Sequence, residues 1–161
     1  MSNTQTPHVF HPAALARAFA AAIAIWKADN AGSALDDFPV VVAGSFDDLR
    51  EEGGVVVVSC EETEANNKHL PASRVWTGTV SVAVEASRDV PLDDAQGAAE
   101  AAAQAVAETE EAGTLAEQWE TFAPEKLFFA AAGAQRFTVD DGVKVLTTEY
   151  AVKLQPAEAE E

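Results

Sequence analysis

The chain has 161 residues, nearly half of them hydrophobic, and ten Lys and Arg residues against 27 Asp and Glu give it a formal net charge of −17. That length allows one domain with an ordinary core, and the charge argues against tight binding to DNA, RNA or an anionic membrane. A single cysteine, Cys60, rules out an intramolecular disulfide.

The N-terminal stretch predicts an arm followed by a helix. Residues 1–11 are polar and have no period, so we expect a mobile arm. Pro12 suits a first helical turn, and the next apolar residues recur at the spacing of one helical face. These residues are Leu15, Phe19, Ile23 and Trp26. The alanines between them predict burial on several sides, against a sheet and a second helix or subunit, with an end near Gly32. No Lys or Arg precedes the apolar stretch 13–26, which therefore lacks the basic start of a secretory signal, and we expect a cytoplasmic protein.

Two valine-rich stretches predict strands. In residues 38–44, FPVVVAG, the position of Pro39 indicates a strand start or a sheet edge. The unbroken valines of residues 55–60, VVVVSC, indicate a strand covered on both faces. Residues 61–73 are polar, contain a proline and predict a loop.

Residues 74–87, RVWTGTVSVAVEAS, predict one long strand around which the sheet is built. One parity holds Trp76, Val80, Val82 and Val84, and the other holds Thr77, Thr79, Ser81 and Glu85. This alternation predicts one buried and one wetter face. If the strand at 55–60 pairs antiparallel with it, the loop at 61–73 forms the tip of an extended hairpin.

Residues 89–111 predict a second long helix, because a proline and two acids stand where a helix begins. Its expected buried stripe consists of Leu92, Ala95, Ala99, Ala102 and Val106. Three glutamates, Glu108, Glu110 and Glu111, stand at the negative end of the helix dipole, where they require solvent or a basic partner. Gly113 suits the C-terminal cap, and Thr114 to Glu117 matches a capping box that opens a short helix.

The last third predicts two strands, over residues 126–137 and 143–155, joined by a hairpin turn at Asp140-Asp141-Gly142. Residues 156–161 form an acidic tail. The order of elements predicts an α+β fold over residues 12–155 as a single domain. We expect a mostly antiparallel sheet of about five strands, two main helices packed on it, and one long hairpin projecting.

The residues with chemical potential do not form a site by their spacing. His8, His11 and His69 stand in the arm and the loop, where a metal site is not expected. Cys60, at the end of a valine strand, is expected to be buried and inert. We therefore predict no catalytic residue, no cofactor and no metal, and a protein that is not an enzyme.

Pairs of acids, Asp36-Asp37, Asp47-Asp48, Asp93-Asp94 and Asp140-Asp141, invite a general acid–base or calcium interpretation. Each pair stands where a turn or helix start favours aspartate, so we expect a structural role, and Gly53-Gly54 predicts a turn. Trp26, Trp76 and Trp119 are expected in the core or a groove. The alanine-rich helices suit a subunit interface and packing on their own sheet equally well. The loop at 61–73 is the best candidate for contacting a partner.

This organisation resembles the tail terminator (tail completion) proteins of long-tailed bacteriophages. The resemblance covers residues 12–155 and rests on order, length and pattern: an N-terminal helix, a hairpin with a long strand such as RVWTGTVSVAVEAS, an alanine-rich helix of about twenty residues, and a final hairpin. That family has no short signature to match residue by residue, so no functional residue is transferred.

The resemblance implies a homo-hexameric ring that caps the tail tube and provides the docking surface for the head–tail connector protein. DNA would pass through the lumen without specific binding, the chain would be a virion protein of the tail or neck assembled in the host cytoplasm, and no membrane would be involved. The wetter face of the long strand, Thr77, Thr79, Ser81 and Glu85, is then the expected lumen or subunit contact.

Three alternatives stay open. Another neck or tail-tube-like phage protein would share parts of this architecture. A small α+β enzyme would require convergent carboxylates such as Asp93 and Asp140. A monomeric binding module would use the loop at 61–73.

Overall fold

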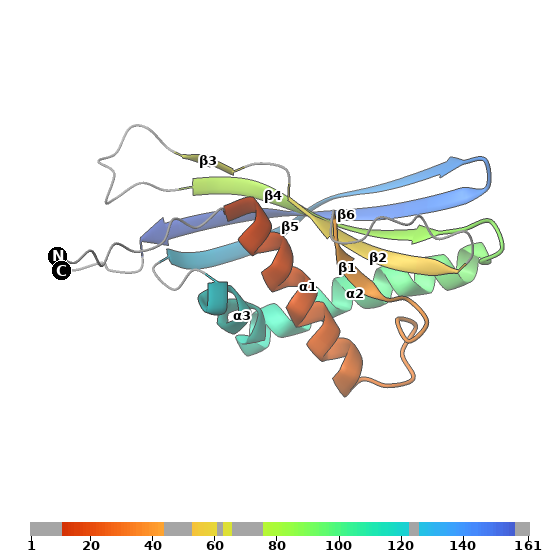
Figure 1. The fold of residues 1–161 in the computed structure, drawn as a ribbon, viewed down its shortest axis with the longest axis horizontal. Helices are drawn as coiled ribbons and strands as arrows, with labels where there is room; N and C mark the ends of the chain where they lie inside the picture. The colour runs from red at the N-terminus through yellow and green to blue at the C-terminus, as the bar shows by residue number, and fades with distance from the viewer. Residues whose placement is uncertain (1–10, 44–52, 61–62, 66–75, 123–125, 157–161) are drawn as a thin grey trace.

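The computed structural model describes residues 11–43, 53–60, 63–65, 76–122 and 126–156 (Figure 1). The helices are α1 (His11–Asp29), α2 (Leu92–Ala112) and α3 (Thr114–Phe122). The strands are β1 (Val40–Val42), β2 (Gly54–Ser59), β3 (Thr63–Ala65), β4 (Trp76–Ala86), β5 (Lys126–Asp140) and β6 (Val143–Pro156). This is the α+β fold that the sequence predicts, with a mostly antiparallel sheet and two main helices packed on it.

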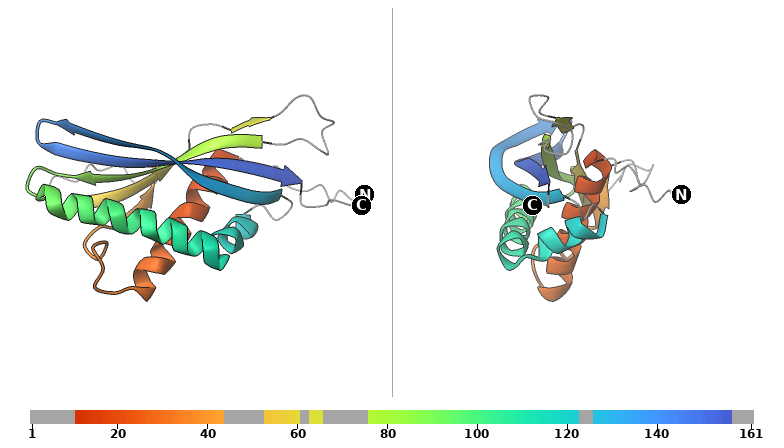
Figure 2. Two further views of the ribbon diagram at one scale, coloured as in Figure 1. Left: turned by 180° about the vertical axis from the view of Figure 1, so that it is seen from behind. Right: turned by 90° about the vertical axis from the view of Figure 1, so that its left-hand side faces the viewer.

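The sheet has the order β1-β2-β4-β6-β5, and β3 pairs with β4 beyond the end of β2. Among the described strands, β1 and β2 alone pair in parallel, with Val40 opposite Val56, Val41 opposite Val57 and Val42 opposite Val58. The helices all lie on one side of the sheet, which is twisted along its length, and the other side carries no helix within the described residues (Figure 2).

Strand β4 is partnered along its whole length, as expected for the element that organises the sheet. Its register with β6 runs without a break from Trp76 opposite Leu154 to Ala86 opposite Lys144. On its other side it pairs antiparallel with β2, from Gly54 opposite Ala86 to Ser59 opposite Ser81, and then with β3. The predicted alternation is confirmed, because Val80, Val82 and Val84 are buried while Thr77 and Thr79 are exposed.

The stretch at 61–73 was expected to be a loop, and part of this prediction is wrong. Thr63–Ala65 forms β3, because β2 ends at Ser59 and leaves the edge of β4 at Trp76–Gly78 free to pair. Residues 61–62 and 66–75, including the expected hairpin tip, lie outside the described residues, as do residues 1–10, Asp47-Asp48 and residues 157–161.

The core lies between the sheet and the helices. Helix α1 contributes its predicted stripe, Leu15, Phe19, Ile23 and Trp26, and all four side chains are buried. It contacts β1, β2 and β4 on one side and α2 and α3 on others, which explains why its alanines are buried as well. Burial of each large apolar side chain contributes about 1.5–3 kcal/mol. The alanine-rich helices thus pack on their own sheet and on each other.

Helix α2 is joined to α1 by a side-chain hydrogen bond. The indole Nε1 of Trp26 donates to the Glu108 carboxylate at 2.7 Å, and Gln104 donates to the same carboxylate at 2.7 Å. The hydrogen bond from Gln104 and then that from Trp26 lower the pKa of Glu108. Neutral donors therefore satisfy this glutamate at the negative end of the helix, whereas Glu110 and Glu111 are exposed to solvent.

Some details of α2 and α3 differ from expectation. Of the predicted buried stripe, Leu92 is 44% exposed and Ala99 is only partly buried, because the buried side of α2 begins at Ala95 and runs through Ala98, Ala101 and Ala105. Thr114 is the first residue of α3 and not its cap: Gly113, at φ 87°, ends α2, and its carbonyl accepts the Glu117 backbone N–H at 3.0 Å. Gly113 therefore ends α2 and also accepts the first backbone hydrogen bond of α3.

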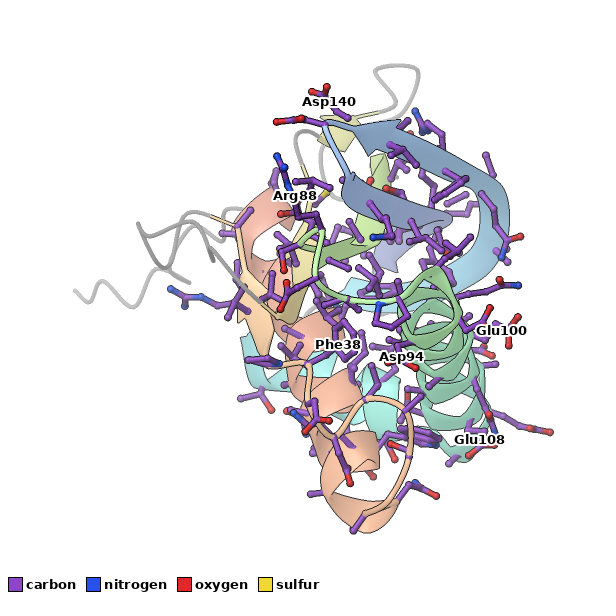
Figure 3. All side chains as sticks on the ribbon, turned by 90° about the vertical axis from the view of Figure 1, so that its right-hand side faces the viewer. Phe38, Arg88, Asp94, Glu100, Glu108 and Asp140 are labelled. Carbon is purple, nitrogen blue, oxygen red and sulfur yellow. The ribbon has the colours of Figure 1, made fainter. Side chains whose placement is uncertain are left out.

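The longest hairpin is formed by β5 and β6. The predicted hairpin turn is confirmed: Asp141 and Gly142 both have positive φ, 56° and 83°, as in a type I′ turn. Arg88, in the connection after β4, forms a 2.8 Å ion pair with Asp141; it lies near the turn that carries Asp140 (Figure 3). Pro156, expected to stop β6, is its last residue and lies opposite Lys126.

Tyr150 on β6 packs its ring against Phe19, with ring centroids 5.7 Å apart, and burial raises its pKa to about 12. Within the described residues its buried hydroxyl has no hydrogen-bond partner.

Because an unsatisfied buried polar group costs about 1–3 kcal/mol, Tyr150→Phe is expected to raise the free energy of unfolding by up to this amount, measured by urea unfolding at neutral pH. The unfolded tyrosine ionises near pH 10 and the folded one near 12, so stability should fall between these pH values more steeply in the wild type. A loss of stability at neutral pH would show that the hydroxyl is bonded.

Candidate functional surface

The side of the sheet away from the helices forms a broad polar surface, called here the open face. A shallow hollow of about 920 Å³ lies on it. It is lined by Ser59, Thr77, Gly78, Thr79, Ser81, Ala83, Glu85, Arg136, Val145, Thr147 and Glu149. Hydroxyl groups and small side chains dominate this lining, so the open face suits contact with a polar surface better than enclosure of a small apolar ligand.

The open face brings together the polar positions that the sequence singled out. Thr77, Thr79, Ser81 and Glu85 come from β4, and the register places β6 beside them, with Ser81 opposite Glu149 and Thr77 opposite Lys153. Arg136 of β5 forms an ion pair with Glu149 across the hairpin. Because both partners are partly exposed, this ion pair contributes little to stability. The lining of the hollow carries charges of both signs, Glu85 and Glu149 with Arg136, and Lys153 lies beside it.

Within the described residues, acidic side chains gather on the helix side. Residues 92–122, which form α2 and α3, contain eight acidic residues and no lysine or arginine. Glu100 and Glu108 lie on the outer side of α2 (Figure 3). The surface of α2 and α3 is therefore acidic.

The acid pairs occupy turns and a helix start. Asp36 accepts the Gly32 backbone N–H at 2.7 Å, Asp93 and Asp94 lie in the first turn of α2, and Asp141 forms the hairpin turn. Asp93 and Asp94 line a hollow of about 450 Å³ with Asp37 and Asp89, whereas Asp140 is not part of that lining. The structure thus does not place Asp93 and Asp140 in one pocket.

Asp89 in this hollow is engaged within the fold. The Ser87 hydroxyl donates to its carboxylate, as does the Gly53 backbone N–H, and the hydrogen bond from Ser87 is the main cause of its lowered pKa. Across the described part of the chain, no group of three or more His, Cys, Asp or Glu residues is arranged to hold a metal ion. His8 and His69 lie outside it.

The remaining predicted residues are structural. Trp119 is buried in the core and Trp26 at the junction of α1 and α2, as expected, and the side chain of Trp76 lies outside the described residues. Cys60 was expected to be buried but is only partly so, because β2 ends at Ser59 and the thiol follows at the rim of the core.

One surface feature was missed by the sequence analysis. Phe137 and Val139 near the end of β5 are 52% and 55% exposed. Their alternation with Arg136, Thr138 and Asp140 was a usable signal, because it predicts one apolar face at the end of the last hairpin, beyond the alanine-rich part of the strand.

Comparison with known proteins gives no family: no family model matches the chain, and a search of curated proteins finds no match. No helix among the described residues has the length and apolar character required to cross a membrane.

Proposed function

We propose that the chain is a structural virion protein, a phage tail terminator that assembles as a homo-hexameric ring. The ring would cap the tail tube and join it to the head–tail connector protein. The observation that carries this proposal is the one-sided sheet. Its helices cover only one side, which leaves a broad polar open face and a long β5–β6 hairpin for contacts with other chains.

The distribution of charge supports passage of DNA through such a ring. Eight acidic residues on α2 and α3, with no basic residue between them, repel a phosphate backbone. The open face offers hydroxyl groups and matched charges, which favour contact with another protein surface. Under this proposal the helix side faces the channel and the open face serves protein contacts. A related neck or tail-tube-like protein would use the same surfaces.

Electron microscopy of the purified chain tests this proposal. Negatively stained particles should be closed rings with a central hole, and these rings should bind the ends of tail tubes and stop their growth. The chain should also leave duplex DNA unshifted in a gel at low salt, where charge effects are largest. Isolated single-chain particles that leave tube growth unchanged, or tight DNA binding, would contradict the proposal.

A further inference from the structure

The exposed apolar side chains gather at one end of the molecule. Four of the five large exposed ones within the described residues belong to the β5–β6 hairpin or to the adjoining start of α2: Leu92, Phe137, Val139 and Val143. Phe137 lies opposite Leu146, which is packed against the core, so it points to the helix side of the sheet. Val139 shares this side with Phe137, whereas Val143 has the parity of the open face. An exposed apolar patch such as that of Leu92, Phe137 and Val139 marks a site of contact with another molecule.

A groove runs through this patch. It has a volume of about 380 Å³ and lies between the start of α2 and the last hairpin. The α2 wall consists of Leu92, Gln96, Ala99 and Glu100, and the wall on the sheet consists of Phe137 and Leu146 with the polar Gln135, Arg136, Thr147 and Thr148. We call Leu92, Gln96, Ala99, Phe137 and Leu146 the hairpin shoulder. Leu92 lies before Ala95, the first buried residue of α2, so this end of the groove is open to solvent.

The hairpin shoulder adjoins an open sheet edge. Strand β5 is the last strand of the sheet, and among the described residues no strand pairs with its outer side. A register shift interrupts it between Ala132 and Gln135, but from Gln135 to Asp140 its pairing with β6 is regular. An open edge presents backbone N–H and C=O groups in a row, ready to bind another chain.

The charge of the hairpin end indicates that the chain bound here is a second copy of the protein. The end of the hairpin that carries the turn, residues 135–147, contains two basic and two acidic residues and is neutral, whereas the rest of the chain is net −17. Two copies repel each other at most surfaces. The neutral, partly apolar end of the hairpin is where one copy can approach another without that repulsion, and contact between two unlike surfaces is the head-to-tail type that closes a ring.

We propose that the hairpin shoulder and the adjoining β5 edge at Gln135–Asp140 bind a second copy of this chain in a head-to-tail contact. This inference rests on the proposed ring and adds the surface through which each subunit binds the next. Phe137 is the central apolar residue of the contact, and Arg136 lies beside it on the side of the sheet that faces away from the helices.

Sedimentation velocity on the full-length chain tests the contact with two variants. Phe137→Glu should weaken assembly by more than tenfold, because it puts a charge into an apolar contact. Ile25→Glu, at a side chain 38% exposed on α1, is the matched control and should assemble like the wild type. Thermal unfolding of both variants checks folding, which a half-exposed side chain should hardly affect.

Amide hydrogen exchange on the wild type gives an independent measurement. The amides of Gln135–Asp140 should become more protected as protein concentration rises, while those of exposed α1 residues should not. The outcomes separate the two proposals. A ring that survives Phe137→Glu, without added protection in β5, overturns the contact alone. A two-copy particle that Phe137→Glu dissociates supports the contact and contradicts the ring. A chain that stays monomeric contradicts both.

Discussion

Replacing Phe19 with alanine should lower the free energy of unfolding by about 3–5 kcal/mol, the usual cost of truncating a fully buried aromatic side chain. Phe19 has no exposed surface and its ring packs against Tyr150, so it joins the middle of α1 to the central strands. The neighbouring positions on α1, among them Ala18, Ala20 and Ala22, are alanines, and such small side chains cannot fill the resulting cavity. Urea unfolding followed by circular dichroism measures the loss.

Ile25→Ala on the same helix is the matched control. Ile25 is 38% exposed, so its truncation should change stability by less than about 0.5 kcal/mol. Both variants must be compared at one protein concentration, because assembly adds to apparent stability. If Phe19→Ala cost no more than Ile25→Ala, α1 would not be packed on the sheet as described.

The second large effect is expected at Gly54, where β2 passes the ring of Phe38. A Cβ added at Gly54 would lie 2.2 Å from Cε2 and 2.6 Å from Cδ2 of Phe38. Phe38 is 5% exposed and belongs to the core, and it also borders the hollow that contains Asp89. Gly54→Ala should therefore lower the free energy of unfolding by about 1–3 kcal/mol or more, as measured by thermal and urea unfolding.

Gly97→Ala in α2 is a control that should change stability in the opposite direction. A Cβ there would meet only the Cβ of Ala34, at 3.5 Å, which is ordinary contact. Gly97→Ala should raise stability by about 0.5–1 kcal/mol, because alanine favours the helix. Adding Phe38→Leu to Gly54→Ala should cost less than the two changes summed. If the two losses of stability were additive, the methyl group added at Gly54 would clash with a residue other than Phe38.

Much of the fold follows from periodicity in the sequence. The spacing of Leu15, Phe19 and Ile23 predicts α1, the alternation from Thr77 to Glu85 predicts the two faces of β4, and Asp-Gly at 141–142 predicts the hairpin turn. These signals are local: the spacing and the alternation each specify the buried face of one element, and Asp-Gly specifies a turn. Because both strands of the central pair carry such alternation, the polar open face was also predictable.

The features that were missed depend on neighbours far away in the chain. Leu92 matches the helical stripe, but it is exposed because the buried row on α2 begins at Ala95. Strand β3 depends on where β2 ends, which no pattern within residues 63–65 reveals. The groove beside Phe137 likewise forms only because α2 packs next to the last hairpin, which is distant in sequence.

The central claim is that this chain forms a ring, and native mass spectrometry of the purified full-length protein tests it most directly. The account predicts a dominant particle of about six times the 16.9 kDa chain mass, which persists on dilution and is lost in Phe137→Glu. A particle of 16.9 kDa alone, at every concentration at which the folded protein can be sprayed, would contradict it.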